Sequence, residues 1–352
     1  MSIAWNESVV LVTGGTGSFG KKFTEVMLTK HRPKKLIIFS RDELKQHDMR
    51  QVWSDLSGEF PIRYFVGDVR DKERLYRAFD GVDIVVHAAA LKQVPACEYN
   101  PFEAVQTNIL GAKNVIDAAI DKGVKRVVAL STDKAVNPIN LYGASKLVAE
   151  KLFVQGNSYA GDEGARFSCV RYGNVVGSRG SVIPLFVEQR RTGTVTVTDE
   201  RMTRFWITLE QGVEFVIRCA ETMHGGEIFV PKIPSMKITD LTDAIAPDCK
   251  VKINGIRPGE KIHESLLSAD EARYTREYED MFVIQPMFPW WDKARLTGGN
   301  SLADGFAYNS DSNTSWLTTD QLKTIANLTE GGESAGVKSS GEPNRQARAK
   351  TE

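Results

Sequence analysis

A glycine-rich turn between a strand and a helix constrains this chain more than any other feature. Residues 8–13 (SVVLVT) are a short, apolar and β-branched run, as expected of a buried parallel strand. The sequence GGTGSFG follows directly and contains the spacing GxGxxG. Glycine permits the tight turn, the approach of backbone to a pyrophosphate, and close packing of the next helix, expected over residues 21–30. The turn therefore predicts dinucleotide binding by Gly14, Thr16, Gly17, Ser18, Phe19 and Gly20.

Strand-like and helix-like segments alternate through the first half of the chain. This alternation indicates repeated βαβ units and hence an α/β fold with a doubly wound parallel sheet. After residue 181 the composition changes, which favours a smaller lobe. Further strands are expected at residues 35–39, 63–66, 82–87, 126–130, 167–171 and 225–230.

The end of the second strand bears on the type of dinucleotide. An NAD site usually has Asp or Glu about 20 residues after the glycine turn, to bind the ribose 2′-hydroxyl. Ser40 and Arg41 occupy that place here, with Lys45 one helical turn further on. A hydroxyl and cations suit a 2′-phosphate, so NADP is favoured. Asp42 keeps NAD open, and Arg41 could also be a solvated surface charge.

Residues after the next two strands are further candidates for cofactor contacts. Asp68, followed by Val69, can accept a hydrogen bond from an adenine amino group or can cap the next helix. Ala88 is small enough to let backbone lie against a cofactor, and Lys92 is a ligand contact or a surface charge. Asn108 lies in a helical run although Asn is a mediocre helix former, so it has a specific role or none.

The segment 131–146 (STDKAVNPINLYGASK) carries most of the reactive side chains. Tyr142 and Lys146 are four residues apart, so on a helix they share a face, where the ammonium can lower the pKa of the phenol. Asp133 and Lys134 follow the fifth strand, and an open α/β sheet binds its ligand at the carboxyl ends of its strands. An acid beside an amine indicates proton transfer beyond simple alcohol oxidation.

Composition excludes several other classes of function. Lys and Arg number 45, as do Asp and Glu, so no net charge attracts nucleic acid or an anionic membrane. The four cysteines form no CxxC pair and the five histidines show no ligand spacing, so a structural metal is not expected. No leader peptide or membrane span is visible, so a cytoplasmic protein is expected.

The second half of the chain supplies two basic loops. Arg201 and Arg204 lie among aromatic residues, and residues 255–261 (GIRPGEK) form the second loop; together they suggest recognition of a diphosphate. Residues 318–328 predict a helix, and the polar tail from residue 331 is expected to be disordered. The expected division is an NADP-binding domain over 1–180 with parts of 205–235, a substrate lobe over 181–295, an extension over 296–330 and a tail over 331–352.

The motifs as a set carry a family resemblance over residues 8–290. They include TGGTGSFG, FSRDELKQ, GDVRDKERL, HAAALKQVP, STDKAVNPINLYGASK, RYGNVVGSRGSV, RMTRFWIT and GIRPGEKIHE. The chain resembles the extended short-chain dehydrogenase/reductases that act on nucleotide sugars. Within them it is similar to the inverting UDP-N-acetylglucosamine 4,6-dehydratases that open pseudaminic acid biosynthesis.

The resemblance implies a catalytic cycle. Tyr142 would take the proton from the sugar O4 while hydride leaves C4 for NADP, and Thr132 would hydrogen-bond O4. Lys134, if neutral, would take the C5 proton, and Asp133, if protonated, would donate to O6 as water leaves. Hydride would return to C6, and C5 would be reprotonated from the opposite face. NADP would thus be regenerated in each cycle and stay bound.

The resemblance also implies the ligand contacts and the assembly. UDP-N-acetylglucosamine would be the substrate, and the chain would form a homo-oligomer, a hexamer by analogy. The implied substrate-binding residues are Lys92, Asn174, Arg179, Arg257 and Glu260.

Three alternatives remain open at this point. Lys134 can be a base only if its pKa is depressed by several units, whereas in plain contact with Asp133 the two form a salt bridge. A UDP-hexose 4-epimerase or a retaining dehydratase, which carries Asp-Glu where this chain has Asp133-Lys134, could use the same fold. A non-enzymatic NADP-binding redox regulator would have no need of the acid and base groups.

Overall fold

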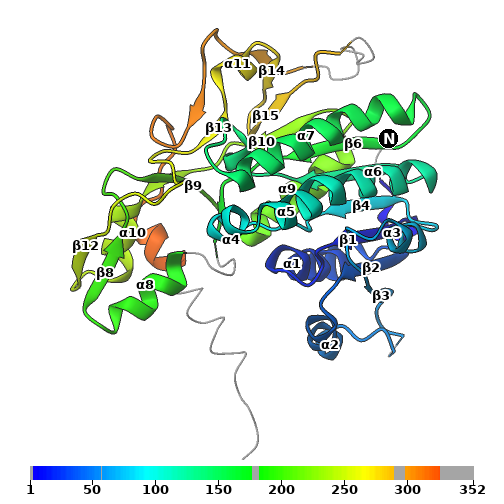
Figure 1. Ribbon diagram of the computed structural model, residues 1–352, viewed down its shortest axis with the longest axis horizontal. Coiled ribbons are helices and arrows are strands. Elements are labelled where there is room, and N and C mark those ends of the chain that lie inside the picture. Colours follow the sequence, from blue (N-terminus) through cyan, green and yellow to red (C-terminus); the bar gives the residue numbers. More distant parts are fainter. Residues whose placement is uncertain (1–2, 57, 177–181, 289–297, 326–352) are drawn as a thin grey trace, which may run out of the picture.

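A ten-stranded sheet organises the computed structural model (Figure 1), which describes residues 3–56, 58–176, 182–288 and 298–325. The strand order is β16-β14-β15-β10-β6-β5-β4-β1-β2-β3. Pairing is parallel from β10 to β3, and antiparallel where β15, β14 and β16 extend the sheet. The chain reverses its direction of winding between β1 and β4, which is the switch point of the predicted doubly wound sheet. The predicted fold class is confirmed.

The strands of this sheet include seven that closely follow the segments predicted from the sequence and three, β14, β15 and β16, that were not predicted. They are β1 (Val9–Thr13), β2 (Lys35–Ser40), β3 (Ile62–Val66), β4 (Ile84–His87), β5 (Arg126–Leu130), β6 (Arg166–Val170), β10 (Ile228–Pro231), β14 (Thr275–Glu277), β15 (Met281–Ile284) and β16 (Asn300–Ser301). Every residue of β4 and of β10 is buried. Since successive side chains of a strand point to opposite faces, both faces of the sheet are covered there.

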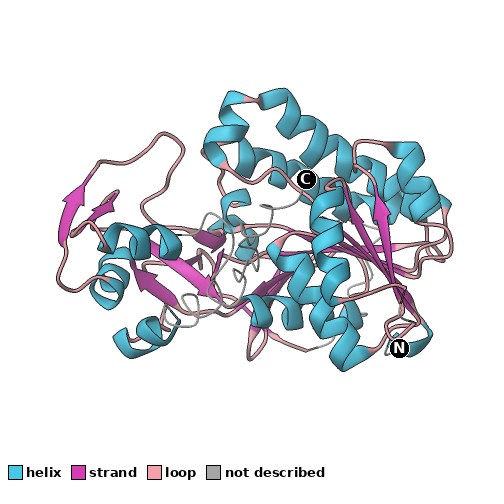
Figure 2. Cartoon of the chain, turned by 90° about the horizontal axis from the view of Figure 1, so that it is seen from below, coloured by secondary structure: helices cyan, strands magenta, loops and turns pink. Residues whose placement is uncertain are grey.

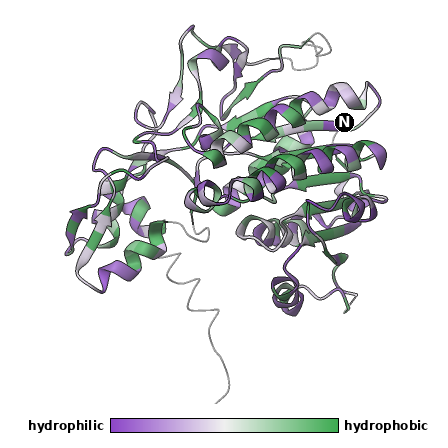
Figure 3. Cartoon of the chain, viewed as in Figure 1, coloured by the Kyte–Doolittle hydropathy of each residue, from purple (hydrophilic) through white to green (hydrophobic). Residues whose placement is uncertain are grey.

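Helices provide this cover. α3, α6 and α7 pack side by side, as do α1 and α9. Figure 3 shows the strands as mainly hydrophobic and the outer surfaces of the helices as mixed or hydrophilic. The helices are α1 (Ser18–Val26), α2 (Glu43–Val52), α3 (Lys72–Ala78), α4 (Val94–Tyr99), α5 (Pro101–Ala104), α6 (Gly111–Asp121), α7 (Leu141–Ala160) and α9 (Leu209–Thr222), with π-helical turns at Met27–His31 and Val105–Leu110.

A smaller lobe has its own hydrophobic core (Figures 1 and 2). The buried Leu322, in a helical stretch over residues 319–325, joins this core. Residue 318 is not helical, and residues 326–328 of the predicted 318–328 helix, like the tail predicted to be disordered, lie outside the described residues. The lobe includes α8 (Val182–Arg190), β8 (Thr194–Val197), α10 (Ile238–Ile245) and β12 (Lys250–Ile253).

Short strands connect the lobe to the main sheet. β7 (Asn174–Val175), β9 (Thr203–Ile207) and β11 (Ser235–Lys237) form a three-stranded sheet. β13 (Ser265–Leu267) pairs with β17 (Tyr308–Asn309), and α11 (Ala269–Ala272) follows β13. None of the described helices is both long enough and apolar enough to cross a membrane.

Candidate active site

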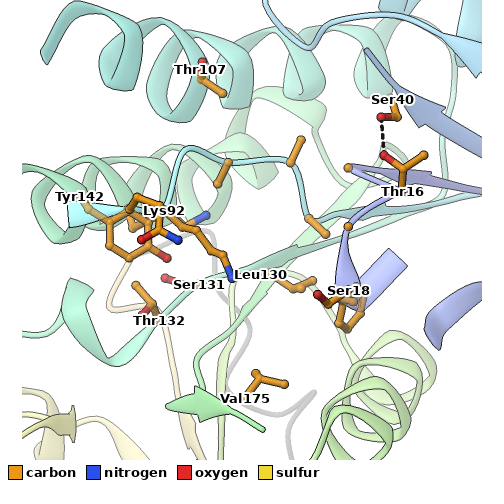
Figure 4. A pocket seen from close by; sticks show the side chains of 18 of the residues that line it. Thr16, Ser18, Ser40, Lys92, Thr107, Leu130, Ser131, Thr132, Tyr142 and Val175 are labelled. Atoms are coloured by element: carbon orange, nitrogen blue, oxygen red, sulfur yellow. Dashed lines mark hydrogen bonds between the residues drawn. The ribbon is translucent and has the colours of Figure 1, made fainter. Parts of the chain in front are cut away.

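A cavity of about 600 Å³ lies at the carboxyl ends of the parallel strands (Figure 4). This edge of the sheet, next to the switch point, is where open α/β sheets bind their ligands. The sequence-predicted residues that line the cavity are Gly14, Thr16, Gly17, Ser18, Phe19, Ser40, Arg41, Asp42, Lys45, Asp68, Val69, Ala88, Lys92, Thr132, Asp133, Lys134, Tyr142, Lys146 and Asn174. The structure thus brings together most of the candidates for cofactor and for catalysis.

The glycine turn begins the cavity wall. A Cβ atom on Gly20 would lie 2.3 Å from the carbonyl oxygen of Gly15, and one on Gly15 would lie 2.7 Å from a methyl group of Ile38. Gly20 therefore serves helix–strand packing and is not among the lining residues. α1 begins at Ser18, with Gly17 as its N-cap, and the first turn of a helix directs its backbone N–H groups towards a phosphate placed at that end. This turn fits a pyrophosphate.

The end of β2 holds the groups that bear on the choice of dinucleotide. The hydroxyls of Thr16 and Ser40 are 2.8 Å apart (Figure 4). The Asp42 carboxylate caps α2 by accepting from the backbone N–H of Lys45, and it pairs with the Lys45 ammonium. Arg41 keeps a side chain that is 58% exposed, with Nη1 3.7 Å from Asp68 Oδ2. The Asp42 carboxylate is thus engaged within its own helix.

Two other candidates have contacts that differ from those expected. Asp68 does not cap the helix that follows, because the N-cap is Asp71; Asp68 instead pairs with Arg70 at 2.8 Å. Asn108 does not line the cavity: its side chain bonds both backbone groups of Leu91 at 2.8 and 2.9 Å and the Ser145 hydroxyl at 2.9 Å. Asn108 thereby fastens the loop after β4, which does line the cavity, to α7.

The acid and the amine lie in a 3-10 turn directly after β5. Asp133, which is 1% exposed, accepts through Oδ1 from the Thr132 hydroxyl at 2.8 Å and from Lys134 Nζ at 3.1 Å. A second carboxylate also faces this amine, with Glu264 Oε1 3.5 Å from Nζ. Glu264 is 3% exposed, does not line the cavity, and was not among the residues predicted from the sequence. Lys134 is thus held between two buried carboxylates.

Electrostatics at this turn correct two predictions. Burial alone would lower the pKa of Lys134, but the carboxylates of Asp133 and Glu264 outweigh it and hold the pKa well above its usual value. The depressed pKa that a resting base requires is therefore not found, and Asp133 and Lys134 form the salt bridge of the alternative interpretation. Burial also raises the pKa of Tyr142 to about 12, against the influence of Lys134 and a hydrogen bond with Thr132, so the expected net lowering by Lys146 is wrong.

α7 places Tyr142 against this turn. The Asn140 side chain caps the helix, accepting from the N–H of Gly143 at 2.7 Å, and donates to the carbonyl of Gly259 at 2.8 Å. A Cβ atom on Gly143 would lie 2.0 Å from the carbonyl oxygen of Lys134, so only glycine allows this approach. Lys146, one turn further on, is buried and lines the cavity as Tyr142 does.

The predicted substrate contacts are only partly gathered at the cavity. Lys92 and Asn174 line it, and Asn174 Oδ1 is buried with no hydrogen-bond partner among the described residues. Arg257 and Glu260 pair with each other at 3.7 Å and do not line it, and Arg179 lies outside the described residues. Arg204, expected to bind a diphosphate, instead donates to three backbone carbonyls, those of Thr203, Lys261 and Ile262.

Sequence reasoning missed two hydroxyls that suit a ligand. Thr107 Oγ1 and Ser131 Oγ are buried, line the cavity, and lack a hydrogen-bond partner within the part of the chain that the structure describes. A buried hydroxyl without a partner is unfavourable, so these two groups indicate where a polar ligand is bound. Nothing in the local sequence marks them, although Ser131 adjoins the conspicuous Thr132. No three His, Cys, Asp or Glu side chains of the described residues gather to hold a metal ion.

Comparison with known proteins identifies a matching family and several similar enzymes. The family described as polysaccharide biosynthesis protein matches residues 10–286. UDP-N-acetylglucosamine 4,6-dehydratase (inverting) from Campylobacter jejuni subsp. jejuni serotype O:2 is 54% identical over 336 residues, which span 93% of this chain and 99% of that protein. UDP-glucose 4-epimerase from Rickettsia conorii is 44% identical over 287 residues, 79% of this chain and 83% of that one.

Solved structures resemble the chain over similar lengths. The X-ray structure of Pen from Bacillus thuringiensis superposes with a TM-score of 0.84 at 37% identity, covering 93% of this chain and 99% of that one. UDP-glucose 4-epimerase from Thermus thermophilus, in complex with NAD, has a TM-score of 0.58 at 25% identity and covers 72% and 88%. The structural neighbours therefore share the Rossmann fold and include an enzyme that binds a nicotinamide cofactor.

Proposed function

Because the chain belongs to the polysaccharide biosynthesis protein family and to the extended short-chain dehydrogenase/reductases, we propose that it dehydrates UDP-N-acetylglucosamine with inversion at C5. The product would be UDP-2-acetamido-2,6-dideoxy-β-L-arabino-hex-4-ulose, and the reaction would open pseudaminic acid biosynthesis. The observation that carries the proposal is the meeting of Asp133 and Lys134 with Tyr142 in one cavity, in a chain 54% identical to a dehydratase of that name.

The catalytic roles follow from the contacts at the turn after β5. Tyr142 would take the proton of O4, with the Thr132 hydroxyl beside it. Lys134 must be neutral to accept the C5 proton, and Asp133 must be protonated to give one to the leaving O6. Transfer of one proton from Nζ to Oδ1 across their 3.1 Å hydrogen bond creates both forms at once. The observed salt bridge and the active pair would then be two arrangements of the same single proton.

We propose NADP as the cofactor. The glycine turn and the hydroxyls of Thr107 and Ser131 fit a dinucleotide, and when bound the nicotinamide would accept hydride from C4 and return it to C6. NADP is favoured over NAD because Asp42 is engaged in capping α2, while Arg41 remains 58% exposed at the same edge. Gly17, Ser18 and the N-terminus of α1 would hold the pyrophosphate.

The remaining assignments complete the proposal. Asn174 and Lys92 would contact the UDP-sugar at the cavity wall, and Arg179, Arg257 and Glu260 would complete that site. Residues 1–180 with parts of 205–235 would form the cofactor domain, 181–295 mainly the substrate lobe, and 296–330 an extension. We propose a homohexamer, which light scattering of the purified protein would test.

The decisive experiment is NMR of the product formed from UDP-N-acetylglucosamine in D2O. We expect loss of water, a C6 methyl group, deuterium at C5 and the L configuration. Lys134→Ala should abolish water loss while bound NADP is retained. Lys232→Ala, which removes a surface amine paired with Glu277 at 2.8 Å, is the matched control and should turn over normally. Full turnover by Lys134→Ala would remove Lys134 from the mechanism.

A UDP-hexose 4-epimerase is the second candidate, since the Rickettsia conorii relative of that name is 44% identical. An epimerase reaction inverts C4 and leaves the C6 hydroxyl in place, with no exchange at C5. A product that keeps O6 would therefore replace the dehydratase assignment by this one.

A further inference from the structure

Glu264 is the buried carboxylate at the site to which the proposed cycle gives no role. It directly precedes β13, and its backbone is fixed on both sides by Ser310: the Glu264 N–H donates to Ser310 Oγ at 2.9 Å, and the Ser310 N–H donates to the Glu264 carbonyl at 2.8 Å. Glu264 Oε2 is buried without a hydrogen-bond partner among the described residues. A buried charge is costly unless it is paired, so the cations around this carboxylate account for its position.

The cations around Glu264 come from three segments. Lys134 Nζ, in the turn after β5, is 3.5 Å from Oε1, and Arg204 Nε, on β9, is 3.8 Å from it. Lys261 precedes Glu264 in the chain and donates to the carbonyl of Val136 at 2.6 Å. Arg204 donates hydrogen bonds to three backbone carbonyls and Lys261 to one. Among these three cations, Lys134 is the one that also lines the cavity.

We infer that Glu264 is a positioning residue that orients the Lys134 amine and keeps the proton shared by Lys134 and Asp133 from being lost to solvent. The inference rests on the proposed function. In many active sites a third group orients the base and stabilises the cation that forms when the base takes a proton. We assign that role to Glu264, with Lys134 as the base. Here the carboxylate lies behind the amine and outside the cavity, as such a group must.

The proton balance defines what Glu264 does in the cycle. Nζ forms a bond to the C5 proton as the C5–H electron pair expels O6, and O6 takes the proton of Asp133 and leaves as water. Lys134 is then an ammonium between two carboxylates, which is the arrangement that the structure shows. C5 then takes, on its opposite face, the proton that Tyr142 removed from O4. Passing one proton from Nζ to Asp133 Oδ1 restores the starting forms of the pair, and Glu264 stays ionised throughout.

The consequence is a shift of the alkaline limit of activity. The pair works only while it holds its one proton, and an anion within 4–6 Å raises the pKa of an amine by about 1–3 units. The charged or titratable groups that face Glu264 are Asp133, Lys134, Arg204 and Lys261, and His263 adjoins it with Nδ1 bound to Thr203 at 2.9 Å.

The test compares kcat–pH profiles of Glu264→Gln, Glu264→Asp and the parent protein. We expect the alkaline limb to move down by about 1–3 pH units in Glu264→Gln, with KM for UDP-N-acetylglucosamine and bound NADP little changed, because Glu264 does not line the cavity. Glu264→Asp keeps the charge one carbon further away and should shift the limb less. Glu277→Gln, which removes a surface carboxylate, should leave the limb in place.

A readout independent of turnover separates this inference from the proposed function. The neutral fraction of Lys134 can be titrated by acetic anhydride labelling of the holoenzyme and mass spectrometry of its peptide, and the midpoint should fall in Glu264→Gln. The role of Glu264 would be overturned if neither the alkaline limb of the kcat–pH profile nor the labelling midpoint of Lys134 shifted in Glu264→Gln. Equal shifts in Glu264→Gln and Glu264→Asp would overturn it as well. If Glu264→Gln does not fold, an unshifted Glu264→Asp would do so. A parent protein that leaves UDP-N-acetylglucosamine unchanged would refute the proposed function alone.

Discussion

Replacing Arg171 by Met should destabilise the protein strongly, because Arg171 is a buried cation shared by two carboxylates. Arg171 is 0% exposed and follows β6. Nε and Nη2 donate to Glu150 at 2.8 and 2.7 Å, and Nη1 and Nη2 donate to Glu271 at 3.0 and 2.8 Å. Since Glu150 belongs to α7 and Glu271 to α11, this guanidinium joins the helix of Tyr142 to the segment after β13.

The magnitude follows from the groups left behind. Removing one partner of a buried ion pair costs about 3–5 kcal/mol, because the remaining charge is uncompensated. Here two carboxylates lose their partner, in a protein whose free energy of unfolding is typically about 5–15 kcal/mol. Replacing all three residues by Met should recover most of the loss, since a well-packed apolar group can substitute for a buried ion pair. About 1 kcal/mol should stay lost, because Glu271 also completes the capping box of α11 with Ser268.

The pH dependence has a defined sign. Burial alone would raise the pKa of Glu271, but Arg171 outweighs it and holds the pKa below its usual value in the folded protein. A depressed folded pKa contributes stability that is present above the unfolded pKa of about 4.3 and is lost as pH falls. In Arg171→Met the Ser268 hydrogen bonds still lower the pKa of Glu271, but Arg171 no longer offsets its burial, so the variant's deficit should be greatest near pH 8 and smaller at pH 5.

The assay is urea unfolding followed by far-UV circular dichroism at pH 8 and pH 5, for the parent protein, the single variant and the triple variant. We expect a single-variant deficit of about 3–5 kcal/mol at pH 8 that shrinks at pH 5. A deficit below about 1 kcal/mol, or a triple variant no more stable than the single one, would show that Arg171 does not hold the two segments through charge.

Two further predictions test the cofactor side of the cavity. Gly20→Ala should lower the free energy of unfolding by about 1–3 kcal/mol and loosen NADP binding, because its Cβ would lie 2.3 Å from the backbone of Gly15. Gly212→Ala in α9 should instead stabilise the protein by about 0.5–1 kcal/mol, because its Cβ would lie 4.0 Å from its nearest neighbour. Thermal shift and bound-NADP content measure both effects. Arg41→Ala should weaken NADP binding about tenfold, a loss of about 1.4 kcal/mol in binding free energy, and should change NAD binding little. Fluorescence titration of the cofactor-free protein measures both affinities, and equal losses for the two dinucleotides would refute the role of Arg41.

Local patterns were sufficient for the seven parallel strands of the sheet, most of which are buried on both faces, but not for the antiparallel extension β14, β15 and β16. A strand such as β5, predicted and found at residues 126–130, shows as a continuous apolar run between polar turns. Helix ends were less predictable: α1 begins at Ser18, not at the predicted residue 21. Its N-cap, Gly17, has no side chain to mark the start, and N-caps are usually recognised by Ser, Thr, Asp or Asn.

The candidate site was predictable where one segment supplies several groups, and unpredictable where distant segments meet. Tyr142 and Lys146 are one helical turn apart, so a shared face follows from their spacing alone. Thr107 and Ser131 are ordinary residues in their own segments, and their importance lies in hydroxyls that burial leaves without a partner in the part of the chain that is described. For Arg204 the sequence predicted a phosphate contact that the structure does not show. Its guanidinium donates instead to backbone carbonyls.

The protonation of Lys134 shows why adjacent residues can be insufficient to define a base. Asp133 and Lys134 are adjacent in the sequence and therefore neighbours in every conformation. Their adjacency alone does not determine the pKa of the Lys134 amine, which also depends on the groups that the fold brings near it. In the folded chain that third group is Glu264, 130 positions further along, fixed by Ser310 and 3.5 Å from Nζ. Two carboxylates around one amine favour the ammonium, so the free base would form by passing its proton to Asp133 while Glu264 stays ionised. The same contacts that argue against a resting base thus define the route by which a working one is made.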